Sequence, residues 1–210
     1  MQLINYLNAH FHTEYTLLKL SNTSAEELLN LQTQQLMPTC SYQLNQSVTC
    51  HSFFGGYDAQ KHTQYYAKGY VEWLKIIKNS SPENAFSIFL KRYQKQLNQL
   101  KTQGLSCEDD KLNNKLNDHI KSEWQHFLNG TYGLCTRSGL PEDIANKELA
   151  ILEINRLISL DPLSTEQLQK LNEVVNLLDK SSALFAPHER IKSSRYRLID
   201  QVREKYQLFI

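Results

Sequence analysis

The sequence predicts an all-α protein in which a small amino-terminal winged helix-turn-helix packs on a carboxyl-terminal helical bundle of about six helices. Three observations support this. Two short amphipathic segments joined by a tight turn lie near the amino terminus, apolar residues recur every three to four positions beyond them, and no long stretch alternates apolar and polar residues. The change of pattern after the glycines near residue 55 gives two expected domains, 1–55 and 56–210.

The amino-terminal helix pair is expected over residues 15–20 and 25–36. Ser24 and Glu27 form a capping box, because each side chain can accept a hydrogen bond from a backbone N–H left free at the start of the second helix. Pro38 ends the pattern, since proline has no backbone N–H to donate.

The helices of the second domain are predicted from the same period and from their start and stop residues. Pro141 begins one helix, the Asp161–Pro162 pair ends it, and Ser164 with Gln167 forms a second capping box. A final helix is expected from about His188. Apolar residues on the faces of these helices include Tyr66, Tyr70, Trp73 and Ile77; Phe86, Phe89 and Tyr93; Ile120, Trp124 and Phe127; Ile144, Ile151 and Ile154; Leu171, Val175 and Leu178; and Leu198, Ile199 and Val202.

The wing of the first domain is expected as a short hairpin over residues 42–48, followed by a loop over 50–56. Between Met1 and Cys50 the chain has one lysine and no arginine against three glutamates, which leaves a net charge of −2. Lysine and arginine contacts to phosphate supply most non-specific affinity for DNA, so this charge argues against nucleic acid as a partner. A transcriptional regulator stays open as an alternative, because glutamine side chains can bind adenine edges.

Two resemblances add to this interpretation. The segments 15–20 and 24–36, with the exit Leu36, Met37 and Pro38, resemble the MerR-type DNA-binding domain, although Asn30, Gln32, Thr33, Gln34 and Gln35 stand where that family has arginines and tyrosines. Nearly the full chain resembles a bacterial family labelled natural product biosynthesis protein. The segments that carry this second resemblance are SFFG at 52–55, YYAKGYVEWL at 65–74, HFLNGTYGLCTRSGLPEDIANKE at 126–148 and FAPHERIKSSRYRLI at 185–199. It implies a link to natural product biosynthesis and assigns no catalytic residues.

The leading candidate site is the loop from Gly130 to Gly139, with the helix expected over 188–197 opposite it. Three glycines allow positive φ angles and close backbone approach around a thiol and a guanidinium. We expect an accessory protein that binds a small molecule or a partner protein here. The predicted ligand-binding residues are Tyr132, Arg137, Arg190 and Arg195.

The alternative function is an enzyme that uses Cys135 and His188, because a nucleophilic thiol needs an imidazole within hydrogen-bond reach. For His188 the competing interpretation is an ordinary helix cap or surface residue. Arg190 and Arg195 could clamp a carboxylate or phosphate through paired N–H groups, or instead form salt bridges to Glu148 or Glu189.

No cofactor and no metal site are expected. The four cysteines have no paired spacing. His119 and His126 share a helical face, and we expect neither to have an acidic or second histidine partner three or four residues away. A net charge of +1 gives no overall attraction to polyanions. The absence of a long apolar run and of a leader-like start predicts a cytoplasmic protein without a membrane span, and the oligomeric state stays open.

Overall fold

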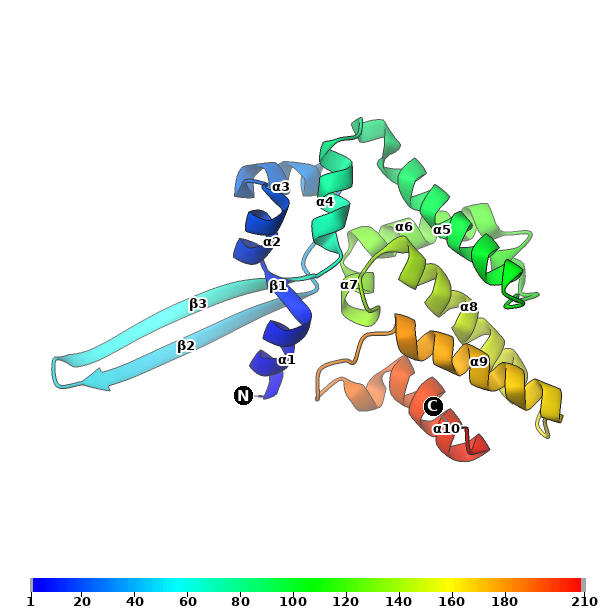
Figure 1. The fold of residues 1–210 in the computed structure, drawn as a ribbon. Coiled ribbons are helices and arrows are strands. Elements are labelled where there is room, and N and C mark those ends of the chain that lie inside the picture. The colour runs from blue at the N-terminus through cyan, green and yellow to red at the C-terminus, as the bar shows by residue number, and fades with distance from the viewer. Residues whose placement is uncertain (1, 209–210) are drawn as a thin grey trace.

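The computed structural model describes residues 2–208 and combines ten α-helices with a three-stranded antiparallel sheet in this part of the chain (Figure 1). The prediction of an all-α protein is therefore wrong. The strands are β1 (Phe11–Thr13), β2 (Tyr42–Ser52) and β3 (Gly55–Ala67), in the order β1-β3-β2. Most side chains on β2 and on the first half of β3 are exposed. Strands are recognised in a sequence by alternating apolar and polar residues, and that pattern arises only where one face of a sheet is buried.

The strands β2 and β3 form a long hairpin that projects from the rest of the molecule as an arm (Figure 1). Its register runs from Tyr42 opposite Tyr65 to Ser52 opposite Gly55. The expected short wing is thus a much longer hairpin, and the expected loop over 50–56 is its tip. The expected domain boundary after residue 55 falls at the start of β3. Because β2 lies before this boundary and almost all of β3 lies after it, the boundary divides a single sheet.

Four helices surround the base of the arm: α1 (Gln2–His10), α2 (Glu14–Ser21), α3 (Ala25–Thr33) and α4 (Tyr70–Lys78). The capping box of Ser24 and Glu27 is present, so α3 begins where the sequence predicts. Tyr66 lies on β3 rather than on the helix expected from it, since that helix starts only at Tyr70.

The remaining helices form the carboxyl-terminal part. They are α5 (Ala85–Thr102), α6 (Leu116–Leu128), α7 (Thr131–Cys135), α8 (Pro141–Ile158), α9 (Thr165–Ser181) and α10 (Gln201–Tyr206). Pro141 lies in the first turn of α8, and the predicted capping box of Ser164 and Gln167 starts α9. The helix expected from His188 differs: a 3₁₀ turn (Arg190–Lys192) and a π-helical segment (Tyr196–Asp200) precede α10.

One hydrophobic core joins the two halves of the molecule. Its centre is an aromatic group in which Trp73, Phe89, Trp124 and Phe127 meet with ring centroids 4.9–6.1 Å apart. The same core includes residues of the amino-terminal helices and of the segment after them, namely Leu17, Leu28, Leu36 and Met37. Burying one such side chain contributes on the order of 2 kcal/mol, so the amino-terminal helices depend on the bundle for stability.

None of the helices between residues 2 and 208 has both the length and the apolar character needed to cross a bilayer.

Candidate functional site

The backbone of the glycine-rich loop has the conformation that the sequence predicts. Gly130 and Gly139 have φ angles of +75° and +80°, which side chains rarely allow. Gly133 lies in α7, and a Cβ atom there would come within 2.2 Å of Ser41 Oγ. The glycines therefore act as the sequence predicts, although the first half of the expected loop is helical.

A cavity of about 270 Å³ opens beside this loop. Three basic side chains line it: Arg137 from the loop, Lys68 from the residue after β3, and His10 from the end of α1. The other lining residues are Tyr6, Phe11, Ala67, Gly133, Thr136, Ala183 and Leu184. No aspartate or glutamate is among the residues that line the cavity, so its charge is positive.

The two permanent cations of this cavity have only backbone partners. Lys68 Nζ donates to the carbonyl of Ala9 at 2.7 Å, and Arg137 Nη2 donates to the carbonyl of Asp179 at 3.3 Å. Within the described chain neither side chain forms an ion pair. Burial lowers the pKa of His10, and the charges of Lys68 and Arg137 lower it further. The site therefore disfavours a third positive charge and favours a negative one.

A larger cavity of about 720 Å³ lies between α5 and residues 105–116. Its lining includes one cation, Lys101, and one acid, Glu108, so it has no net charge to select a ligand. We place the candidate site at the smaller cavity because charge and glycine-rich backbone coincide there.

The structure does not bring Cys135 and His188 into hydrogen-bond contact. Cys135 ends α7 and is half-buried, and its backbone carbonyl accepts a hydrogen bond of 2.7 Å from Lys147 Nζ. The His188 side chain is 61% exposed, and its Nε2 lies 3.7 Å from Glu189 Oε1. The predicted thiol–imidazole pair therefore lacks its defining interaction.

Arg190 and Arg195 are occupied by carboxylates of the chain itself. Arg190 Nη2 lies 2.9 Å from Asp200 Oδ2, and Arg195 pairs with Asp179. These partners differ from the Glu148 and Glu189 considered from the sequence. Of the predicted guanidinium groups, Arg137 alone lines the candidate cavity.

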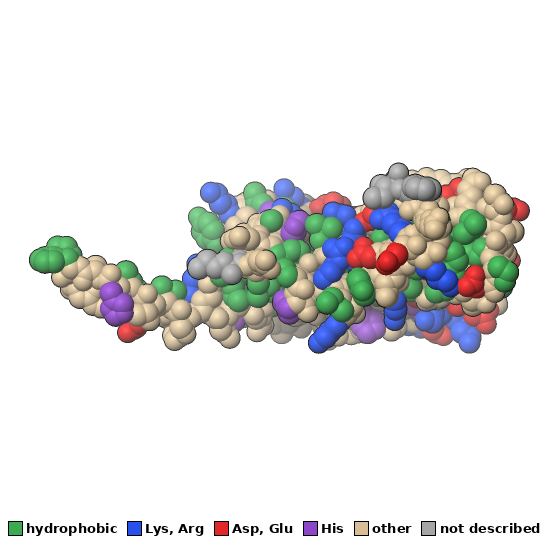
Figure 2. All heavy atoms as spheres, turned by 90° about the horizontal axis from the view of Figure 1, so that it is seen from below, with side chains coloured by type: hydrophobic (Ala, Val, Ile, Leu, Met, Phe, Trp, Pro, Cys, Tyr) green, Lys and Arg blue, Asp and Glu red, His purple; other side chains and the backbone are tan. Residues whose placement is uncertain are grey.

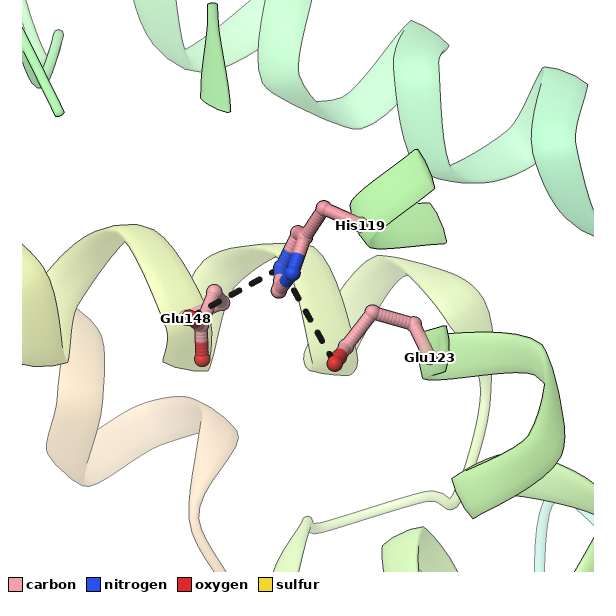
Figure 3. Close-up of side chains that lie close together, drawn as sticks. All are labelled: His119, Glu123 and Glu148. Atoms are coloured by element: carbon pink, nitrogen blue, oxygen red, sulfur yellow. Dashed lines mark ion pairs between the residues drawn. The ribbon is translucent and has the colours of Figure 1, made fainter. Parts of the chain in front are cut away.

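Tyr132 does not line the cavity, and its side chain contacts a second polar group instead. Its hydroxyl donates a hydrogen bond to Glu123 on α6, a buried carboxylate whose pKa burial raises. Beside Glu123 lie His119, one helical turn earlier, and Glu148 on α8 (Figure 3). Each of the three side chains offers one ligand atom, and these atoms lie within 4.8 Å of one another.

Sequence reasoning missed both groupings for different reasons. Glu123 stands four residues after His119, so the sequence does contain an acidic partner at helical spacing, and the expectation that His119 has none is wrong. His10, Lys68 and Arg137 are far apart along the chain, and no local pattern could have grouped them.

Comparison with known proteins gives one match. Neither a curated protein nor a solved structure matches the chain. A family model described as a family of unknown function, DUF6058, matches residues 85–207, which run from the start of α5 through α10. This match covers more than half of the sequence. The chain therefore belongs to the DUF6058 family.

Proposed function

We propose that this protein binds a small organic or inorganic anion in the cavity between the Gly130–Gly139 loop and the end of α1. The observation that carries the proposal is that Arg137 and Lys68 line one cavity without any carboxylate partner in residues 2–208. Both cations sit at an exposed edge of the cavity, so a ligand can reach them from solvent. A guanidinium and an ammonium together suit a carboxylate, sulfate or phosphate group.

The size of the cavity limits the ligand. Sites for drug-sized molecules occupy roughly 300–1,000 Å³. A cavity of about 270 Å³ falls below that range and suits a ligand with few non-hydrogen atoms, or the acidic end of a larger one. The likeness to natural product biosynthesis proteins supports an accessory role, in which the ligand is an acidic intermediate of such a pathway.

The test measures sulfate binding to the full chain by calorimetry, with chloride added to keep the ionic strength constant. Arg137→Gln and Lys68→Gln should each weaken binding at least tenfold, because each removes a charge-assisted hydrogen bond worth about 1.5–3 kcal/mol. Lys192→Gln is the matched control, since Lys192 is exposed and lies outside the cavity. Equal sulfate affinity in all four proteins would contradict the proposal.

A further inference from the structure

A second buried polar group lies between α6 and α8 and shares no residue with the lining of the anion cavity. Glu123 lies one helical turn after His119 on α6, and the side chain of Glu148 approaches both from α8 (Figure 3). His119 Nε2 is 3.9 Å from Glu123 Oε1 and 3.7 Å from Glu148 Oε1. All three side chains are at most 20% exposed.

One polar atom of this group, His119 Nε2, is buried without a hydrogen-bond partner among residues 2–208, and the hydroxyl of Tyr93 on α5 is a second such atom in the core. Tyr93 is fully buried, and besides burial the charges of Glu123 and Glu148 raise its pKa. A buried polar atom without a partner costs about 1–3 kcal/mol. His119 Nε2, which lies between the two glutamates, therefore points to a bound species that would satisfy it.

The negative charge of the group is compensated only in part. Two carboxylates lie side by side, and the Nζ of Lys111 is 4.0 Å from Glu148 at the end of a mostly exposed side chain. Buried charges are normally paired with an opposite charge or coordinate a metal. A dication between the three side chains would neutralise both carboxylates at once.

The observed distances suit metal ligands better than hydrogen bonds. A hydrogen bond from His119 Nε2 to a carboxylate would need about 2.7–3.2 Å. Ligand atoms at about 2.0–2.2 Å from a tetrahedral zinc ion lie roughly 3.3–3.6 Å apart, so the 3.7 and 3.9 Å separations need to shorten only slightly.

We propose that His119, Glu123 and Glu148 bind one divalent transition-metal ion such as Zn²⁺. One imidazole and two carboxylates are nitrogen and oxygen ligands that Zn²⁺ accepts, and a water molecule completes the coordination. Tyr132 acts as a positioning residue, because its hydrogen bond orients the Glu123 carboxylate. The ion links α6 to α8 and so stabilises the helical part.

The competing explanation is a protonated His119 that acts as the counter-ion of both glutamates. It predicts that the group stabilises the fold without binding a metal. The two explanations are separated by measuring metal binding itself rather than stability alone.

The experiment uses the full chain treated with a chelator and then dialysed free of it. Zn²⁺ is titrated against a chromophoric chelator, and Co²⁺ is added in parallel because its visible absorption reports four-coordinate geometry. We expect one Zn²⁺ per chain, a visible Co²⁺ spectrum, and an increase in the unfolding temperature on adding Zn²⁺. His119→Gln and Glu148→Gln should each lower Zn²⁺ affinity at least tenfold, and Tyr132→Phe should lower it about tenfold.

The control is His51→Gln, which removes an exposed histidine of the arm and should leave Zn²⁺ affinity unchanged. Glu148→Gln keeps the test decisive if His119→Gln fails to fold, because Glu148 is the most exposed of the three side chains. Absence of stoichiometric Zn²⁺ binding, or binding that Glu148→Gln leaves intact, would overturn the proposal.

Discussion

The indole Nε1 of Trp73 donates a hydrogen bond of 2.9 Å to the backbone carbonyl of Leu36, and both residues are buried. This bond ties α4 to the segment that follows α3, within the core that the amino-terminal helices share with the bundle. Trp73→Phe removes the donor, leaves the carbonyl unpaired and opens a cavity. We expect a loss of about 2–4 kcal/mol in the free energy of unfolding, measured by urea denaturation.

Trp124→Phe is the matched control for this prediction. Trp124 belongs to the same aromatic group, but its indole N–H makes no hydrogen bond within the described chain. The control should therefore lose less stability than Trp73→Phe. Equal losses in the two variants would show that the bond to Leu36 contributes nothing.

The stability of the protein should fall at acid pH through Asp179. Burial by itself raises the pKa of this carboxyl, but hydrogen bonds and charge from Arg203 and Arg195 outweigh it, so the pKa is lowered. A lowered folded-state pKa gives stability that is present above the unfolded value of about 3.9 and lost as the pH falls through the folded value. We expect Asp179→Asn to cost about 2 kcal/mol or more at pH 7, because Arg195 is left buried without its partner.

The difference between the native protein and Asp179→Asn should shrink when urea denaturation is repeated at pH 3, because the unfolded state, with a pKa of about 3.9, then binds a proton at Asp179 that the folded state resists. Asp118→Asn provides the comparison, because the pair of Asp118 with Lys121 is exposed and should contribute little at either pH. A difference that stays constant between pH 7 and pH 3 would be inconsistent with a lowered pKa at Asp179.

Sulfate affinity should increase as the pH falls from 8 to 5.5. The pKa of His10 is lowered by burial and by the charges of Lys68 and Arg137, so the side chain is neutral at pH 8. A bound anion favours the protonated form, so each step toward acid strengthens binding. Tyr6, whose pKa burial raises to about 12, does not titrate in this range.

The measurement is calorimetric titration with sulfate, whose own charge is constant over these pH values. His10→Gln should make the affinity independent of pH. His12→Gln is the control, because burial and Lys68 also lower the pKa of His12 while its side chain does not line the cavity. If His12→Gln rather than His10→Gln abolishes the pH dependence, the role given to His10 is wrong.

The tip of the arm should be dispensable for stability. Phe53 and Phe54 are 97% and 95% exposed, and Figure 2 shows the hydrophobic side chains at the end of the arm, far from the helical part. Replacing both by serine should change the free energy of unfolding by less than about 0.5 kcal/mol. Tyr66→Ala, at the buried base of the same hairpin, should instead cost about 3 kcal/mol or more. A large loss from the double serine variant would show that the tip packs against the protein.

Several helices could be predicted because their signals are local. The capping boxes at Ser24 and Ser164 and the proline at Pro141 start helices in the sequence and in the structure alike. The positive φ angles of Gly130 and Gly139 were predictable for the same reason. The length of the β2–β3 hairpin was not: the short hairpin expected over 42–48 extends to residue 67, and most of the added residues face solvent and carry no apolar alternation.

The candidate site, like the fold, could be predicted from the sequence only in part. Arg137 could be singled out from its glycine-rich surroundings, and it does line the cavity. Arg190 and Arg195 could not be separated from it, because a sequence does not show which guanidinium already has a carboxylate partner.

The sequence by itself determined where helices begin, where the backbone needs glycine, and that the first fifty residues are poor in cations. Hydrogen bonds and steric limits over three or four residues suffice for these features. Only the tertiary structure decided that His10, Lys68 and Arg137 share a cavity and that Glu148 reaches His119 and Glu123. Those groupings arise from helix packing across long stretches of chain, and the electrostatic energy of each group depends on distances that no local pattern encodes.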